Sequence, residues 1–236
     1  MPTIAENLEL VRSRIAQAAA KANRSDGDIE LVAVTKTHPA ETVREAVEAD
    51  QVVFGESKVQ EARAKIHLLP SNLHWHFIGH LQKNKVRHAL ALFELIHGVD
   101  SLELAQAIDR IADEDGLHPR VLLEVNVAGE ASKFGFQPAR LREEMEVLLA
   151  LPRLSIEGLM CIPPISEDSG ASRRYFVSLR ELRDNLENKF DLKLPHLSMG
   201  MTNDYTVAVE EGATLVRVGT AIFGERKRKS EVRHLA

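Results

Sequence analysis

Apolar positions along this chain follow two alternating patterns. Residues 3–23 carry apolar side chains at helical spacing, at Ile4, Leu8, Val11, Ile15 and Ala18. The next segment, residues 29–36 (IELVAVTK), is a short apolar run rich in β-branched residues, which predicts a buried strand. Pro39 then stands where a second helix can begin, and the alternation of strand and helix continues along the chain.

Eight strand patterns can be recognised in all, separated by helical segments. The predicted strands are residues 29–36, 51–57, 74–80, 93–100, 119–127, 154–162, 194–200 and 213–224, of which those around 51–54 and 194–197 are short. The predicted helices between them are residues 37–50, 58–69, 82–92, 101–115, 138–151, 168–190 and 203–212. This alternation indicates parallel βαβ units, and eight units in about 220 residues favour an α/β fold of the closed (β/α)8 (TIM) barrel type.

No linker or shift of composition divides the chain, so we expect a single domain over residues 1–236. Residues 1–25 form its N-terminal helix, and residues 226–236 form a polar, frayed tail. The hydrophobic content of 44% and charged content of 28% are ordinary for a globular protein. A net charge of −5 gives no reason to expect a nucleic-acid partner.

The N-terminal segment is amphipathic and carries acidic residues, unlike a secretory signal or a transit peptide. No apolar run is long enough for a membrane span, so we expect no membrane partner. The only cysteine, Cys161, excludes an intramolecular disulfide and fits a cytoplasmic protein. No long apolar surface stripe stands out, which favours a monomer.

The active face of such a barrel lies at the carboxyl ends of its strands. The candidates there are Lys36, Glu56, Ser57, Gly79, Asp100, Asn126, Met160, residues 198–201, Gly219 and Thr220. Lys36 is the most specific of them because it ends an apolar strand. A lysine that is partly desolvated there has a lowered pKa and is a good nucleophile towards an aldehyde. The alternative is a strand-end lysine whose ammonium group reaches solvent.

Two turns rich in small residues follow the seventh and eighth strands, SMGMTND at 198–204 and VGTAIFG at 218–224. Loops at these positions of a barrel often bind phosphate. Gly200 and Gly219 allow backbone N–H groups to approach phosphate oxygens, and Ser198 and Thr220 add hydroxyl donors. A helix that begins near Asn203 would point its positive end at the same place. The alternative is two ordinary turns.

Arg217 lies inside the apolar strand LVRVG, where a charge needs a partner. One interpretation is a salt bridge across the barrel, for example to Glu124, and the other is a guanidinium that faces a ligand beside Gly219. The histidines of HWHFIGH, His74, His76 and His80, suggest a metal, but they have no cysteine or acidic partner nearby in sequence, so we expect no metal site. Cys161 is more typical of a small buried apolar residue than of a nucleophile.

Seven motifs, in this order, resemble those of the pyridoxal phosphate homeostasis proteins. They are AVTKTHP, FGESKVQEA, WHFIGHLQKNK, LLEVNVAGEASKFGF, IEGLMCIPP, LSMGMTNDY and VRVGTAIFGER, and they extend from about residue 29 to residue 226. The resemblance implies the barrel of the fold-type III pyridoxal-phosphate enzymes without the second domain of alanine racemase.

The resemblance also implies a cofactor, pyridoxal 5′-phosphate (PLP), bound as a Schiff base to Lys36. Its phosphate cradle would be made by Ser198, Met199, Gly200, Gly219 and Thr220, and Arg217 would face the pyridine nitrogen. Asn126 and the segment 82–85 belong to family motifs without a single defined role. The chain departs from the family at Ser57, where an asparagine is common, so an amide contact from that position is lost or bridged by water.

These residues favour a binding role over catalysis. Arg217 can only donate hydrogen bonds, so it keeps the pyridine nitrogen unprotonated and the cofactor a weak electron sink. Racemisation needs a second base, and Tyr175 and Tyr205 both lie in predicted helices. We therefore predict PLP storage and delivery to PLP-requiring apo-enzymes, with no catalytic residue. The alternatives are a weak PLP-dependent amino-acid racemase, a cofactor-free Schiff-base aldolase and a non-catalytic scaffold.

Overall fold

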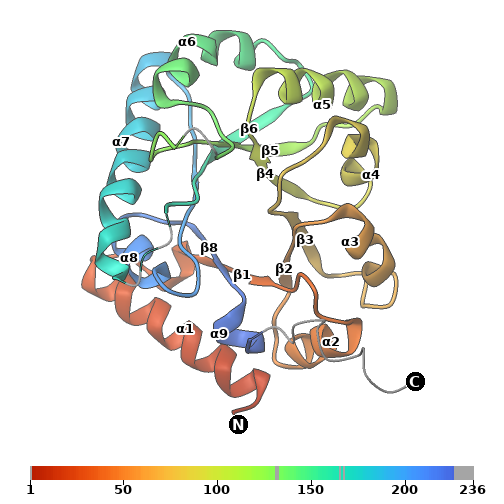
Figure 1. Cartoon of the computed structure of the whole chain (residues 1–236), viewed down its shortest axis with the longest axis vertical. Helices are drawn as coiled ribbons and strands as arrows, with labels where there is room; N and C mark the ends of the chain where they lie inside the picture. Colours follow the sequence, from red (N-terminus) through yellow and green to blue (C-terminus); the bar gives the residue numbers. More distant parts are fainter. Residues whose placement is uncertain (1, 131–132, 165, 167, 226–236) are drawn as a thin grey trace.

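Eight parallel strands close into a barrel at the centre of the molecule (Figure 1). The computed structural model describes residues 2–130, 133–164, 166 and 168–225. The strands follow one another in chain order, and the last pairs with the first. They are β1 (Glu30–Val34), β2 (Val53–Glu56), β3 (His74–Phe77), β4 (Leu95–Val99), β5 (Arg120–Glu124), β6 (Ser155–Met160), β7 (His196–Ser198) and β8 (Leu215–Val218). The predicted single-domain (β/α)8 barrel is confirmed.

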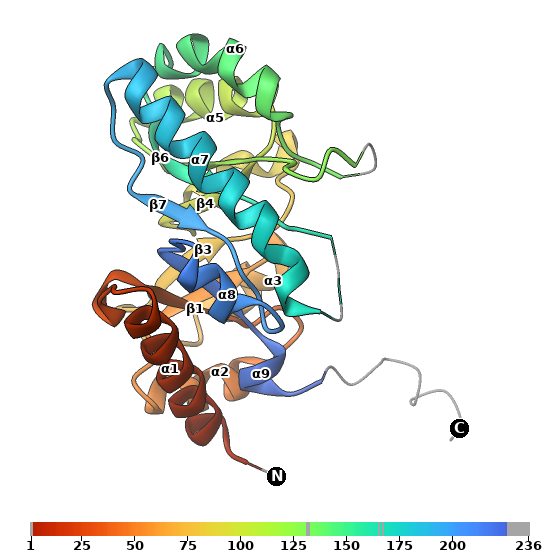
Figure 2. The ribbon, with the colours of Figure 1, turned by 90° about the vertical axis from the view of Figure 1, so that its left-hand side faces the viewer.

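Helices surround the barrel, as Figures 1 and 2 show from two directions. The α-helices are α1 (Ile4–Lys21), α2 (Ala40–Glu48), α3 (Val59–Ile66), α4 (Val86–Leu90), α5 (Leu102–Asp115), α6 (Pro138–Leu149), α7 (Arg173–Phe190), α8 (Tyr205–Glu210) and α9 (Thr220–Phe223). Short 3-10 turns are η1 (Asp26–Asp28), η2 (Lys83–Lys85) and η3 (Ser169–Ser172). Helix α1 precedes the first strand and packs against α2, α8 and α9, so it contacts helices from both the beginning and the end of the barrel sequence. No helix in the described ranges is long and apolar enough to cross a membrane.

Local sequence signals explain where several helices begin and end. Thr3 and Glu6 form a reciprocal capping box at the start of α1. The hydroxyl of Ser101 caps α5 by accepting the N–H of Leu104, and α5 ends at Gly116 in the left-handed region, at φ 67°. These caps satisfy backbone groups that the helices themselves leave unpaired.

The apolar core has two layers. The larger layer lies between the barrel and its helices and contains the inward faces of α1, α5 and α7. A smaller cluster fills the barrel interior, with one side chain from each of six strands, Val32, Val53, Leu95, Leu122, Met160 and Leu215. The barrel is therefore a packed core, and ligands have access to it from its ends.

Every strand is shorter than predicted, and the corrected ends of two of them bear on the site. The first strand ends at Val34, before Lys36. The prediction of a strand up to residue 224 is wrong beyond Val218, where the chain turns into α9 with N–H bonds from Ile222 and Phe223 to the Gly219 carbonyl. Since the neighbouring strand has also ended, no partner is left to extend this part of the sheet. The predicted frayed tail, residues 226–236, lies outside the described residues.

Candidate functional site

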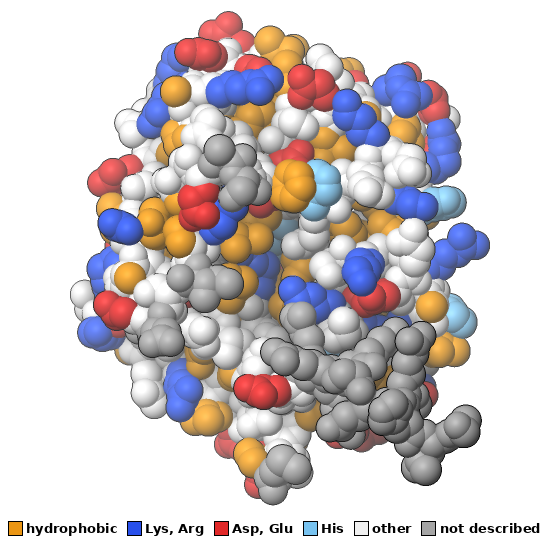
Figure 3. All heavy atoms as spheres, viewed as in Figure 1, with side chains coloured by type: hydrophobic (Ala, Val, Ile, Leu, Met, Phe, Trp, Pro, Cys, Tyr) orange, Lys and Arg blue, Asp and Glu red, His pale blue; other side chains and the backbone are white. Residues whose placement is uncertain are grey.

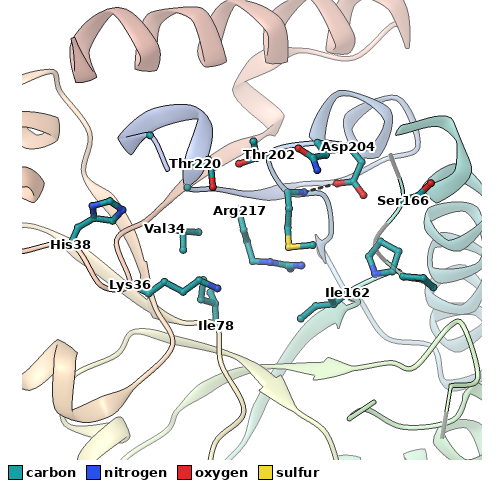
Figure 4. Close-up of a pocket in the computed structure, with 16 residues that line it drawn as sticks. Val34, Lys36, His38, Ile78, Ile162, Ser166, Thr202, Asp204, Arg217 and Thr220 are labelled. Carbon is teal, nitrogen blue, oxygen red and sulfur yellow. Dashed lines mark hydrogen bonds between the residues drawn. The ribbon is translucent and has the colours of Figure 1, made fainter. Parts of the chain in front are cut away.

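A cavity of about 430 Å³ opens at the carboxyl ends of the strands (Figure 4). Its lining comes from the carboxyl ends of β1 and β8 and from the segments that follow β1, β3, β6, β7 and β8, so residues far apart in the sequence meet there. Apolar side chains line part of it, among them Val34, Ile78 and Ile162, and the ionisable side chains in the lining are Lys36, His38, Asp204 and Arg217. In the space-filling view of the molecule, acidic and basic side chains are interspersed (Figure 3). A concave, mostly apolar site with a few polar groups is typical of small-molecule binding.

Lys36 stands at the corner of a tight turn directly after β1. The N–H of His38 donates to the carbonyl of Thr35 at 3.0 Å and closes this turn. Thr37 has φ 70°, in the left-handed region that a β-branched residue rarely adopts. The N–H of Thr37 donates to the Glu61 carboxylate at 3.2 Å, which helps to hold this conformation. The strained turn fixes the backbone on both sides of Lys36 and turns its side chain into the cavity (Figure 4).

A buried ion pair supports this turn from below. Lys65 of α3 donates to the Glu56 carboxylate at 2.5 Å and to the carbonyl of Thr35 at 2.8 Å. The Thr35 hydroxyl donates to the same carboxylate oxygen at 2.6 Å. The Glu56 side chain is 0% exposed and that of Lys65 is 8% exposed. A buried charge without an opposite charge beside it is strongly unfavourable, so Lys65 and Glu56 stabilise each other. The pair thereby links α3 and β2 to Thr35, the residue that precedes Lys36.

Arg217 reaches the cavity from β8 and is buried. Its Nη1 donates to the carbonyl oxygen of Ser198 at 2.9 Å and also to the Ser198 hydroxyl, and its Nη2 donates to the carbonyl of Cys161 at 2.9 Å. These bonds occupy three of the five guanidinium N–H groups, and within the described residues the one on Nε and one on Nη2 have no acceptor, so they can donate to a ligand.

Glu124 is not an ion-pair partner of Arg217: the described residues place no carboxylate within 4.0 Å of the guanidinium. Burial lowers the pKa of Arg217, while the nearby Cys161, Glu124 and Asp204 oppose that effect. The interpretation as a cross-barrel salt bridge is therefore wrong, and the guanidinium faces the cavity. A buried cation held by neutral acceptors favours an electron-rich ligand beside it.

Backbone donors lie on the side of the cavity that β7 and β8 form. Thr202, Asn203, Gly219 and Thr220 all line it. Within the described ranges, the N–H groups of Thr202, Asn203 and Gly219 donate to no protein acceptor. A Cβ on Gly219 would lie 3.3 Å from the Val34 carbonyl oxygen and Cβ, so this close approach favours glycine. Free N–H groups and threonine hydroxyls together are suited to an oxyanion such as a phosphate.

Three predicted residues lie behind this lining. Ser198 is fully buried and bonds Arg217, and Met199 is fully buried in the core. Gly200 has φ 90°, and its carbonyl accepts the N–H of Arg217 at 3.0 Å. None of the three is among the residues that line the cavity, so any effect they have on a ligand is through the residues that they contact. Thr202 and Asn203, which do line it, were included in the SMGMTND motif but were not singled out.

Asn126 lines a separate cavity of about 210 Å³ that shares Ile162 with the larger one. Its amide donates to the carbonyl of Glu130 at 2.8 Å, while its side-chain oxygen is buried with no hydrogen-bond partner among the described residues. Ser57 packs its backbone against Gly79, and neither it nor the segment 82–85 lines the larger cavity.

The three histidines of HWHFIGH diverge. His74 contacts Glu94 at 2.5 Å, His80 contacts Asp100 at 2.8 Å, and His76 points into the barrel. The described residues contain no group of three or more His, Cys, Asp or Glu side chains that could hold a metal ion. Cys161 is fully buried, and burial raises the pKa of its thiol to about 12, so it is not poised as a nucleophile.

Comparison with known proteins identifies the class of this barrel. The family model for the alanine racemase N-terminal domain matches residues 5–227. Alanine racemase from Bartonella henselae has the same fold, with a TM-score of 0.71 at 14% identity, and this chain covers 60% of it. The barrel is thus of the alanine racemase N-terminal class.

Much closer relatives match nearly the whole length of the chain. The pyridoxal phosphate homeostasis proteins of Aquifex aeolicus and Pseudomonas aeruginosa are each 45% identical, over 94% and 96% of this chain and 98% and 97% of theirs. The structure of PipY from Synechococcus elongatus with PLP bound has a TM-score of 0.84 at 42% identity, covering 94% of this chain and 100% of that one. The chain belongs to the family of pyridoxal phosphate homeostasis proteins.

Proposed function

We propose that this protein binds PLP in the cavity beside Lys36 and stores it for delivery to PLP-requiring apo-enzymes. The observation that carries the proposal is the convergence on one cavity of an amine, a donor-only guanidinium and a group of free N–H donors. These match the aldehyde, the pyridine nitrogen and the phosphate of PLP, in that order. A volume of about 430 Å³ is within the range of small-molecule sites.

Each residue has a separate task in this proposal. Lys36 would hold the cofactor through its amine, by condensation with the aldehyde and release of water, and the strained turn around it would fix the position of that amine. Thr202, Asn203, Gly219 and Thr220 receive the phosphate. Arg217 presents its remaining N–H groups to the ring nitrogen, which must then stay unprotonated to accept them. When bound, PLP supplies a reversible covalent link to amines and an electron sink, and Arg217 limits the second of these.

The composition of the lining supports a role in storage and delivery without catalysis by the protein itself. Racemisation requires a base on each face of the reacting carbon. The described lining contains no tyrosine: Tyr175 lies on α7 with its hydroxyl accepting from Arg174, and the Tyr205 side chain is buried at the start of α8. We also infer that the protein acts as a monomer in the reducing cytoplasm, consistent with its single buried thiol.

A transfer assay tests storage and delivery. The protein is loaded with PLP, freed of excess ligand and mixed with a PLP-requiring apo-enzyme, whose activity reports delivery. We expect recovery of that activity, and no recovery when Lys36→Ala protein is carried through the same loading. Lys193→Ala, which removes an exposed lysine elsewhere, should behave as wild type.

The alternative function has its own readout. Incubation of the loaded protein with L-alanine or L-serine, followed by chiral analysis, should show no D-enantiomer above the level that free PLP produces. Turnover that disappears in the Lys36→Ala variant would instead identify a racemase. A protein that never binds PLP would leave the aldolase and scaffold alternatives.

A further inference from the structure

A chain of polar side chains crosses the barrel interior beneath the cavity. It runs from Arg217 to the hydroxyl of Ser198, then to His97 on β4, and then to His76 on β3. Nδ1 of His97 lies 2.8 Å from Oγ of Ser198, and Nε2 of His97 lies 3.1 Å from Nδ1 of His76. Ser198 and His97 are 0% exposed, and His76 and Arg217 are 4% exposed. The barrel interior is otherwise filled by apolar side chains, so water is largely excluded from this polar chain. The protons that lie between its members must therefore be donated from one member to the next.

The direction of the chain can be derived from its first member. The guanidinium of Arg217 only donates, so Oγ of Ser198 accepts there. The hydroxyl proton then needs an acceptor, and within the described residues Nδ1 of His97 is the further partner in reach. Nδ1 of His97 is therefore unprotonated, and the ring carries its proton on Nε2.

The same reasoning extends to His76. Nε2–H of His97 donates to Nδ1 of His76, so His76 carries its own proton on Nε2. The reverse direction would leave the fully buried Ser198 hydroxyl proton without an acceptor, which is unfavourable. Both rings must be neutral for this pattern. Burial lowers the pKa of His97 well below its ordinary value and that of His76 to about 4, with Arg217, His74 and His196 among the nearby groups that contribute to one or the other.

We propose that His97 is a positioning residue for Arg217: it holds the Ser198 hydroxyl in the one orientation that accepts from the guanidinium, and so fixes the N–H groups that Arg217 presents to the cavity. Its effect on a ligand rests on the proposed PLP site, whereas the direction of the hydrogen bonds does not. His76 contributes by requiring the Nε2–H form of His97. The chain of side chains ends at His76, which lines a polar cavity at the opposite end of the barrel together with His74, Arg120 and His196.

The protonation pattern is tested on the protein without any ligand. Two-bond ¹H–¹⁵N correlation spectra of ¹⁵N-histidine-labelled protein at pH 7 report which ring nitrogen carries the proton. We expect the Nε2–H form for both His76 and His97, with assignments made from His76→Phe and His97→Phe variants. An Nδ1–H form or an imidazolium at His97 would overturn the proposal.

The positioning role is tested by a double-mutant cycle with PLP as the probe. His97→Phe keeps a ring but removes the acceptor, and we expect PLP affinity to fall about 3- to 10-fold, as for loss of one hydrogen bond. Ser198→Ala should cause a similar loss, and the double variant should be no worse than either single one, because both break the same link. His97→Asn, whose side-chain oxygen can replace Nδ1 as the acceptor, should recover part of the affinity. His88→Phe, at an exposed position on α4, is the matched control.

The outcomes separate this proposal from the proposed function. If wild-type protein binds no PLP, the proposed function fails while the ¹⁵N spectra still decide the direction of the chain. If PLP binds and the His97→Phe loss is absent or adds fully to that of Ser198→Ala, the positioning role is wrong and the PLP site stands.

Discussion

The buried Lys65–Glu56 pair gives a sharp test of how the turn around Lys36 is held. Replacing Lys65 with Met removes the cation but retains an unbranched apolar side chain of similar length. It leaves the Glu56 carboxylate at 0% exposure with only the Thr35 hydroxyl to stabilise it, and it takes the Lys65 donor from the Thr35 carbonyl. Removal of one partner of a buried pair typically costs about 3–5 kcal/mol. Since a domain's whole free energy of unfolding is about 5–15 kcal/mol, the loss should be conspicuous in urea unfolding.

The double variant Glu56→Gln/Lys65→Met separates charge from packing. A glutamine can accept the Thr35 hydroxyl without placing a charge in the core, so we expect the double variant to recover at least about 2 kcal/mol of the loss in the single variant. A Lys65→Met loss below about 1 kcal/mol, or a double variant less stable than Lys65→Met alone, would refute the assignment of this pair as the support of the turn.

Three further outcomes follow from other parts of the structure. Burial and nearby Asp100 raise the pKa of Glu124 to about 7 from an ordinary 4.5, so the folded state holds this proton more tightly. Its stabilising contribution should therefore be present below about pH 4.5 and be lost as pH rises through about 7. Over this pH range we expect the free energy of unfolding of the wild-type protein to fall by roughly 2–3 kcal/mol, and this decline should be smaller in Glu124→Gln. Equal dependence of the free energy of unfolding on pH in the two proteins would contradict this. Gly200→Ala should lower stability by about 2–4 kcal/mol in the same unfolding assay, because φ is 90° and the new Cβ would lie 2.5 Å from that of Ala208; an unchanged unfolding midpoint would show that the turn adapts. The Cys161 thiol, with its pKa raised to about 12, should react with a thiol reagent only after urea unfolds the protein, and rapid labelling of the native state would show that it is accessible.

The barrel could be predicted because its repeating pattern is local. Each strand and helix leaves its own apolar signature, and the rule that sites lie at strand ends then places Lys36, Gly219 and Thr220 at one end of the barrel. The sequence identifies Arg217 as a charge in a buried strand, but whether it pairs with Glu124 or faces the cavity depends on distances across the barrel. The structure resolves it through bonds to Ser198 and Cys161.

Other features leave little trace in the sequence. Ser198 ends β7, and Met199 and Gly200 come directly after it, yet the turn of the chain places Thr202 and Asn203 on the cavity. His97 is a polar residue in an apolar strand that no motif singles out, and its partner Ser198 is 101 residues away, so no local pattern predicts their contact. The left-handed conformation of Thr37 has no sequence signal because glycine or asparagine is the usual choice there.

Reduction with borohydride tests the central claim most directly. The purified protein is incubated with PLP, reduced and digested, and the modified peptide is identified by mass spectrometry. We expect an absorption band near about 420 nm that disappears on reduction, with the adduct on Lys36 and none in the Lys36→Ala variant. A protein that stays colourless with added PLP, or an adduct that persists on another lysine when Lys36 is replaced, would contradict the assignment of this cavity as the PLP site.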